Sequence, residues 1–215
     1  MILAVGNTKG GVGKTTTTIQ LATYLKAVRK VDRLWVIDGD EQHSTLEALT
    51  ERNNDQSRAP IACASYSTAE EIMGQVRAQK DTYDHILIDI GGRDTEALRA
   101  ALLSCDALLI PVVPRALDLK AMHHLYKVMQ SAWSLQARFS AYAFLSCADV
   151  QGSANSESLE YMQGFEKITM LDAPLSRRKS FAQATAWGLS VTEDKPKDAK
   201  ACAEVESLIN KIYMN

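Results

Sequence analysis

The sequence has few cysteines, and none of them are paired at metal-binding spacing. Its four cysteines lie far apart, at Cys63, Cys105, Cys147 and Cys202. Because no C-x-x-C pair occurs, neither a zinc site nor an iron–sulfur cluster is predicted. We therefore expect free thiols in a reducing compartment, which is the cytoplasm.

Long apolar runs and excess charge are also missing. No apolar run approaches the roughly 18 residues of a membrane-spanning helix. The first predicted strand starts at Ile2, so we expect neither a signal peptide nor a DNA-reading domain before it. The formal net charge is −2 over 215 residues, so nucleic-acid binding would need a local basic patch. No linker or repeat divides the chain, and residues 1–215 are predicted to form one domain.

Short apolar runs alternate with segments of helical periodicity. Strands are expected at residues 2–6, 33–38, 61–66, 84–90, 107–114, 139–147 and 167–171. Helices are expected at residues 17–28, 44–49, 68–79, 95–103, 117–133, 156–163, 177–187 and 198–213, with a polar surface loop at 51–59. This alternation predicts an α/β fold with a doubly wound, mostly parallel sheet and helices on both faces.

A glycine-rich segment joins the first predicted strand to the first predicted helix. Such a loop turns backbone N–H groups toward an anion, and the start of the helix adds further N–H groups. Lys14 is expected to reach the β- and γ-phosphates of a nucleotide, and the Thr15 hydroxyl to bind Mg²⁺. The pattern G-x-x-x-x-G-K-[ST] is not fully met, because Thr8 replaces its first glycine and Lys9 adds a lysine. The predicted nucleotide-binding residues of the loop are Lys9, Gly10, Gly11, Val12, Gly13, Lys14, Thr15 and Thr16.

Three aspartates fall at the ends of predicted strands, where parallel sheets bind ligands. Asp38 and Asp89 are predicted to hold Mg²⁺ through its water molecules, because magnesium keeps several waters in proteins. Asp40 follows the second strand by two residues and is predicted to orient the water that attacks the nucleotide. The alternatives are a helix or turn cap for Asp38 and a solvated loop acid for Asp40.

These motifs together resemble the ParA/MinD family of ATPases. The segment from Lys9 to Thr16 resembles the family's deviant Walker A motif. The other matching segments are 38–42 (first switch, D-x-D-P-Q), 86–92 (Walker B and second switch), 106–118, and 174–191. Glu41 replaces the usual proline of the first switch, and Gly91-Gly92 replace the usual small residue and proline of the second. Neither departure removes a predicted ligand.

The resemblance implies an ATPase that uses ATP and Mg²⁺ and works as a two-chain switch. It is closest to small ParA-type partition ATPases without a DNA-reading domain. Lys9 matches the signature lysine that crosses to the nucleotide of the partner in an ATP-bound homodimer, so Lys9, Lys14 and Asp40 are the implied catalytic residues. Pro174 is an implied nucleotide contact. The family also implies a nucleoid-associated protein, a ParB-like partner encoded separately, and plasmid or chromosome segregation.

Branches of the family differ in what the ATP-bound dimer holds. Non-specific DNA binding would use basic residues near the C-terminus, here Arg177, Arg178, Lys179 and Lys197. These residues would contact phosphates, although a charged surface without ligand is the alternative. A MinD-like membrane helix is not expected, because the last helix has a mixed polar face and is predicted to pack on the sheet. Positioning of another cargo, and a ligase or reductase component on the same loop, are the remaining alternatives.

Overall fold

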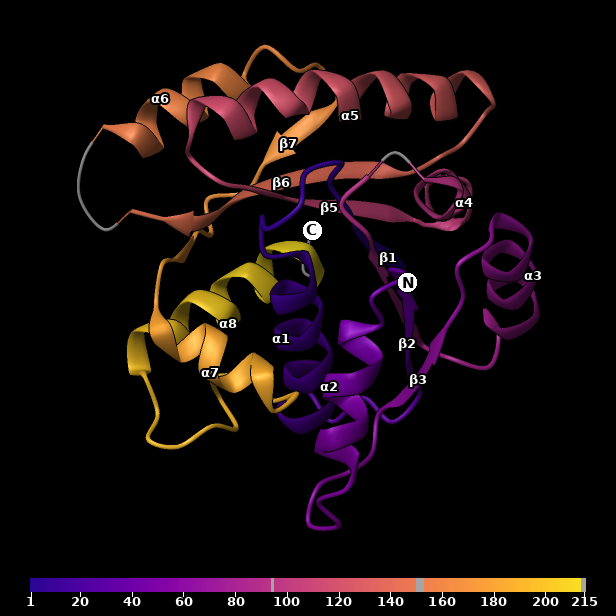
Figure 1. Cartoon of the computed structure of the whole chain (residues 1–215), viewed down its shortest axis with the longest axis vertical. Helices are drawn as coiled ribbons and strands as arrows, with labels where there is room; N and C mark the ends of the chain where they lie inside the picture. The colour runs from indigo at the N-terminus through magenta and orange to yellow at the C-terminus, as the bar shows by residue number, and fades with distance from the viewer. Residues whose placement is uncertain (94, 150–152, 214–215) are drawn as a thin grey trace.

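The strands form one parallel sheet, as the sequence predicted. The computed structural model describes residues 1–93, 95–149 and 153–213 (Figure 1). The strand order is β3-β2-β4-β1-β5-β6-β7, and β8 pairs with β6. Each of these pairings is parallel. The strands are β1 Ile2–Val5, β2 Leu34–Gly39, β3 Ala62–Ser65, β4 His85–Ile90, β5 Ala107–Val112, β6 Ser140–Ala148, β7 Ile168–Met170 and β8 Leu175–Ser176.

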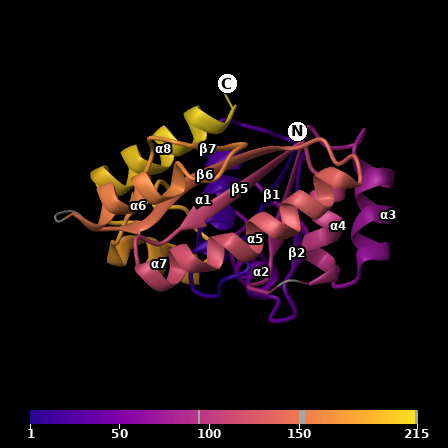
Figure 2. The same cartoon turned by 90° about the horizontal axis from the view of Figure 1, so that it is seen from above.

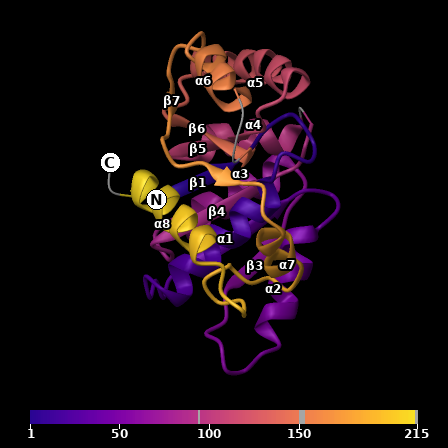
Figure 3. The same ribbon diagram turned by 90° about the vertical axis from the view of Figure 1, so that its left-hand side faces the viewer.

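Helices cover both faces of the sheet, so the doubly wound architecture is confirmed (Figures 2 and 3). One face carries α3 Ala69–Gln79, α4 Glu96–Ser104, α5 Ala116–Ser134 and α6 Ala154–Met162. The other carries α1 Lys14–Ala27, α2 Ser44–Asn53, α7 Lys179–Ala186 and α8 Ala199–Tyr213. None of the described helices combines the length and apolar composition that crossing a membrane requires.

The central strands are apolar throughout because both of their faces are buried. In β1, Leu3 and Val5 belong to the core under α1 and α8, whereas Ala4 belongs to the core under α4 and α5. In β4, Leu87 and Ile88 point to opposite cores in the same way. This arrangement places the carboxyl ends of β1, β2 and β4 beside one another, and the predicted aspartates and phosphate loop lie at or just after those ends.

Several elements differ in their bounds from the sequence expectation; α1, for example, begins at Lys14 rather than at residue 17. Helix α2 runs to Asn53, beyond the predicted end at residue 49, so it takes in part of the predicted loop at 51–59. Arg52, in the last turn of α2, is buried. Strand β8 has two residues, which is too short for a periodic pattern to reveal. Helix α8 buries its apolar side, including Val205 and Ile209, in the core of the sheet, as predicted.

Candidate phosphate-binding site

The glycine-rich loop lies between the end of β1 and the start of α1, and two of its glycines are required by the backbone. Gly11 and Gly13 have φ values of 73° and 91°, a region that only glycine adopts without strain. A Cβ atom on Gly13 would also lie 2.7 Å from Ser146 Oγ. The loop is therefore held in a shape that another residue at these two positions would disturb.

A cavity of about 630 Å³ opens beside this loop. Its lining includes Gly10, Gly11, Gly13, Lys14, Thr15 and Thr16 of the loop, together with Asp40 and the pair Gly91-Gly92. The loop residues predicted to bind a nucleotide therefore surround one space, with two exceptions in the loop. Val12 is buried in the protein, and Lys9 lines a neighbouring cavity.

Lys14 is the cation of this loop that lies inside the cavity. Its side chain is buried, and its Nζ donates a hydrogen bond to the Lys9 carbonyl oxygen at 3.1 Å. Burial lowers the pKa of the Lys14 ammonium, and the charges of Asp89 and Asp40 oppose that shift. A buried ammonium with one hydrogen-bond acceptor among the described residues is well suited to receive phosphate oxygens.

Asp89 combines with two hydroxyls beneath the cavity. Its Oδ2 accepts hydrogen bonds from Thr15 Oγ1 at 2.8 Å and from Thr45 Oγ1, whereas its buried Oδ1 has no partner among the described residues. A threonine hydroxyl beside a carboxylate with an unpaired oxygen is a donor set that fits Mg²⁺ or its water ligands. Thr45 was missed by the sequence analysis, since it lies 44 residues from Asp89 and only packing brings the two together.

Asp38 uses both carboxylate oxygens to hold the backbone that follows β2. Oδ1 accepts from the Asp40 N–H at 3.0 Å, and Oδ2 accepts from the Leu46 N–H at 2.8 Å, in the first turn of α2. The side chain is fully buried, and this burial raises its pKa. Both Asp38 oxygens therefore hold backbone N–H groups after β2 and in the first turn of α2, and its metal role stays a prediction.

The two switch segments meet at the edge of the cavity. Asp40 lines the cavity, and its Oδ1 accepts from the Gln42 N–H at 3.1 Å. A Cβ atom on Gly91 would lie 3.2 Å from Asp40 Oδ2, and one on Gly92 would lie 2.8 Å from Gly10 Cα. The glycine pair in the second switch therefore allows the close approach of Asp40 on one side and of the phosphate loop on the other.

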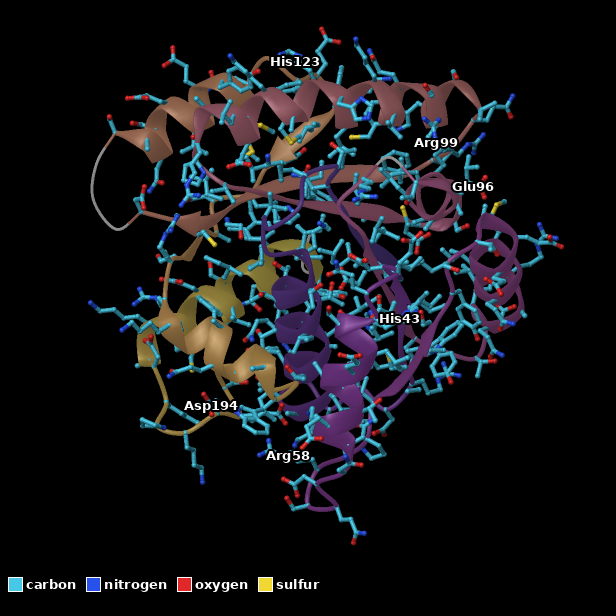
Figure 4. The ribbon with its side chains drawn as sticks, viewed as in Figure 1. His43, Arg58, Glu96, Arg99, His123 and Asp194 are labelled. Carbon is cyan, nitrogen blue, oxygen red and sulfur yellow. The ribbon has the colours of Figure 1, made fainter. Side chains whose placement is uncertain are left out.

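His43 adds a contact to the first switch that the sequence analysis did not identify. It occupies the position before α2 with a φ of 53°, and its Nδ1 lies 2.6 Å from Ser65 Oγ (Figure 4). Ser65 Oγ in turn donates to the Asp38 carbonyl oxygen at 3.0 Å. The end of β3 thus anchors the loop that carries Asp40.

Lys9 lies on the outer side of the loop, in a second cavity of about 620 Å³. Its Nζ is 3.9 Å from Asp118 Oδ1 in the first turn of α5. Leu117 and Arg177 line the same cavity, and Leu117 is 74% exposed. Pro174 is exposed and lines neither of these two cavities, and its contact with a nucleotide stays a prediction.

The four basic residues predicted to bind DNA differ in their surroundings. Arg178 donates to Glu204 Oε1 from Nε at 3.0 Å and from Nη2 at 2.7 Å, and it also lies 3.9 Å from Asp198. Its charge is therefore balanced within the protein. Arg177, Lys179 and Lys197 are exposed.

We expect Asp89→Asn to stabilise the metal-free protein, and more so at pH 8 than at pH 5. Burial raises the pKa of Asp89 to about 6, from 3.8. Since the folded state binds this proton more tightly than the unfolded state, stability from this group is greatest at low pH and falls as pH rises to about 6. The gain in free energy of unfolding should be about 1 kcal/mol larger at pH 8 than at pH 5. Urea unfolding in the presence of EDTA measures it.

The exposed Asp81→Asn serves as the control for this experiment, and its free energy of unfolding should match that of the unmodified protein at both pH values. An equal effect of Asp89→Asn at pH 5 and pH 8 would contradict the expectation, because it would show that the buried carboxylate does not titrate in this range.

Comparison with known proteins agrees with this geometry. Residues 3–191 match the family described as the CobQ/CobB/MinD/ParA nucleotide binding domain. Maintenance of carboxysome distribution protein A of Halothiobacillus neapolitanus is 24% identical over 98% of this chain and 95% of its own length. Protein ParA of Rhizobium radiobacter is 22% identical over 96% of this chain and 91% of its own.

Solved structures share the fold. Apo McdA of Cyanothece superimposes with a TM-score of 0.81 at 16% identity, over 98% of both chains. The septum site-determining protein MinD of Pyrococcus horikoshii, in complex with Mg-ADP, gives a TM-score of 0.73 at 17% identity, over 99% of this chain and 95% of its own. Because the family match covers most of the chain, this protein belongs to the CobQ/CobB/MinD/ParA family of nucleotide-binding domains.

Proposed function

We propose that this protein is a ParA-type positioning ATPase that hydrolyses ATP and switches between nucleotide-dependent states. The observation that carries the proposal is the placement of the two loop lysines on opposite sides of one loop. Lys14 lies inside the phosphate cavity, whereas Lys9 lies outside it, against Asp118. One lysine thus serves the nucleotide of its own chain, and the other is available to a second copy.

The residues around the first cavity divide the chemistry of hydrolysis among them. Lys14 would bind the β- and γ-phosphates, and the Thr15 hydroxyl and Asp89 would hold Mg²⁺ and its waters. When bound, Mg²⁺ neutralises charge on the phosphate oxygens. Asp40 would accept a hydrogen bond from the attacking water and orient it toward the γ-phosphate. Asp38 would keep Asp40 in place through the backbone bond between them.

Dimerisation would complete the site. Lys9 would leave Asp118, cross to the phosphates of the partner and stabilise the charge that develops there, as an arginine finger does in trans. The ion pair with Asp118 is long and half exposed, with 45% of the Lys9 side chain open to solvent, so breaking it costs little. Association would thereby depend on the nucleotide, which makes the protein a switch.

DNA would be the surface on which the ATP-bound dimer rests. Arg177, Lys179 and Lys197 lie on the C-terminal segments and are exposed, so they would contact phosphates without reading sequence. Because Arg178 is paired with Glu204, we assign it to the structure of this surface rather than to the contact.

The relatives support a positioning role more directly than any one cargo. The names of two of them refer to carboxysome distribution, and another is called ParA. The sequence suggested plasmid or chromosome DNA as the cargo. The names of the two carboxysome proteins suggest a compartment as the alternative cargo. In both cases a separately encoded partner, ParB-like for DNA, would stimulate hydrolysis and release the ATPase.

We expect Asp40→Ala to bind ATP normally but to remain on DNA. Without the carboxylate that orients water, turnover should fall about 100-fold or more, whereas Lys14 and the loop glycines remain in place. The test is a DNA titration with ATP, with ADP and without nucleotide, at two salt concentrations. The unmodified protein should bind only with ATP and more weakly at high salt, and Asp40→Ala should dissociate more slowly.

The exposed Asp81→Ala is the matched control and should behave as the unmodified protein does. Unchanged turnover in Asp40→Ala would remove Asp40 from the mechanism. DNA affinity of the unmodified protein that is the same with ATP and with ADP would refute the switch.

A further inference from the structure

We propose that Arg93, which directly follows the second switch, is a phosphate ligand of this chain and contacts the γ-phosphate of the bound nucleotide. The inference rests on the proposed function, since it assigns a further residue to the same site. Arg93 is not one of the residues that the sequence analysis singled out.

The placement of Arg93 follows from the contacts of its neighbours. Arg93 lines the phosphate cavity together with Lys14 and Thr15. The residue before it, Gly92, approaches the phosphate loop so closely that a Cβ atom there would lie 2.9 Å from the Gly10 nitrogen and 3.3 Å from Lys14 Nζ. The backbone that carries Arg93 is therefore packed against the part of the loop where the γ-phosphate would lie.

The charges around the cavity show why a second cation is useful. Lys14 and Arg93 are the cations among the described lining residues, while Asp40 and Glu41 line the same cavity with negative charge. Lys9 lies in the second cavity, beside Asp118. With Arg93 directed inward, the chain would set two positive charges of its own against the two acids before any partner arrives.

A guanidinium at this position suits a terminal phosphate better than an ammonium would. It has five N–H donors in a planar fork that matches two phosphate oxygens, and it stays charged at any pH of interest. The Arg93 side chain is exposed, so contact with a phosphate would not require it to leave a buried site. At Thr95, two residues later, the side chain accepts from the Leu98 N–H at 3.3 Å and fixes the start of α4. The chain is thus held by contacts at Gly92, before the arginine, and at Thr95, after it.

The γ-phosphate, rather than the α- or β-phosphate, is the expected partner. Gly92 lies beside the Lys14 ammonium, which is expected to bridge the β- and γ-phosphates. The opposite side of the second switch, at Gly91, lies against Asp40, the residue proposed to orient the attacking water. The contact of Arg93 with the nucleotide would therefore form only when the γ-phosphate is present.

Binding of a non-hydrolysable ATP analogue and of ADP, each with Mg²⁺, tests the inference. We expect Arg93→Ala to weaken binding of the analogue about 10- to 100-fold, as for loss of a charge-assisted hydrogen-bond pair, and to change ADP binding by less than about 3-fold. Arg93→Lys should retain part of the analogue affinity, because it keeps the charge but loses the fork. Arg77→Ala, which removes an exposed arginine from α3, is the matched control and should change neither affinity.

Equal weakening of analogue and ADP binding in Arg93→Ala, or no weakening of either, would overturn the assignment. Thermal unfolding without nucleotide verifies that Arg93→Ala is folded. If it is not folded, the comparison of analogue and ADP binding is made with Arg93→Lys instead. Failure of the unmodified protein to bind the analogue would refute the proposed function together with this inference. If the unmodified protein and Arg93→Ala bound the analogue equally well, only the role of Arg93 would be refuted.

Discussion

Lys14→Ala is expected to weaken Mg·ATP binding by about 100-fold or more, the largest functional effect of any single change in the phosphate site. The ammonium lies inside the cavity and, among the described residues, donates a hydrogen bond to the Lys9 carbonyl oxygen. In the presence of nucleotide it would make charge-assisted hydrogen bonds to two phosphates. Arg93, the other cation among the described lining residues, is proposed to contact only the γ-phosphate, so it would not replace the bond of Lys14 to the β-phosphate.

The same substitution should leave the ligand-free protein folded. Burial lowers the pKa of Lys14, which means that its charge is disfavoured by the fold until an anion arrives. Thermal unfolding with and without Mg·ATP separates the two effects. The unmodified protein should gain about 2.7 kcal/mol at an ATP concentration of 100 times Kd, whereas Lys14→Ala should gain almost nothing at that concentration.

Lys26→Ala provides the control on the same helix. Lys26 lies in the last turn of α1, where its Nζ donates to the Asp32 carbonyl oxygen at 3.0 Å, far from the phosphate loop. Its loss should not change ATP binding. If Lys14→Ala retained the ATP affinity of the unmodified protein, the cavity could not be the phosphate site.

Gly188→Ala is expected to have the largest effect on stability, lowering the free energy of unfolding by about 3–5 kcal/mol. Gly188 has a φ of 64°, which disfavours any side chain. A Cβ atom there would lie 2.1 Å from the Ala48 carbonyl oxygen and 3.0 Å from Arg52 Cβ. Because the first of these atoms belongs to the backbone of α2, relief would require the helix to move. Urea unfolding measures the loss.

The position matters because the chain after α7 is bound to two helices that leave the nucleotide site. From α2, the buried Arg52 donates to Glu193 at 2.8 Å. From α1, Gln20 donates to the Leu189 carbonyl oxygen at 3.1 Å and accepts from the Val191 N–H at 2.8 Å. A shift at Gly188 would therefore disturb the region that links the first switch to the basic C-terminal surface.

Gly74→Ala is the matched control for the glycine substitution. Gly74 lies on the exposed side of α3, and a Cβ atom there meets nothing within 4 Å. Since alanine favours the helix over glycine, this change should add up to about 1 kcal/mol of stability. Equal stability of Gly188→Ala and Gly74→Ala would contradict this prediction, because it would show that α2 moves away from the added Cβ atom at little cost in free energy.

The sequence alone determined the fold class and the phosphate loop, because both follow from local patterns. Continuous apolar strands alternating with helical segments have few solutions other than a covered parallel sheet. The loop from Lys9 to Thr16 is one continuous run of residues, so its glycines and lysines by themselves predict the backbone turn that binds phosphate. Asp89 lies near the end of one strand and Asp40 just after the end of another, and strand ends meet at one edge of such a sheet.

The tertiary structure decided what each side chain does, because that depends on partners distant in the sequence. It bonded Asp38 to the first turn of α2, joined Thr45 to Asp89, and placed Arg178 against Glu204. It also separated the two lysines of the loop, with Lys14 in the phosphate cavity and Lys9 beside Asp118 outside it. A motif fixes its own backbone over a few residues, whereas the ion pairs and hydrogen bonds between distant segments form only when packing brings their elements together.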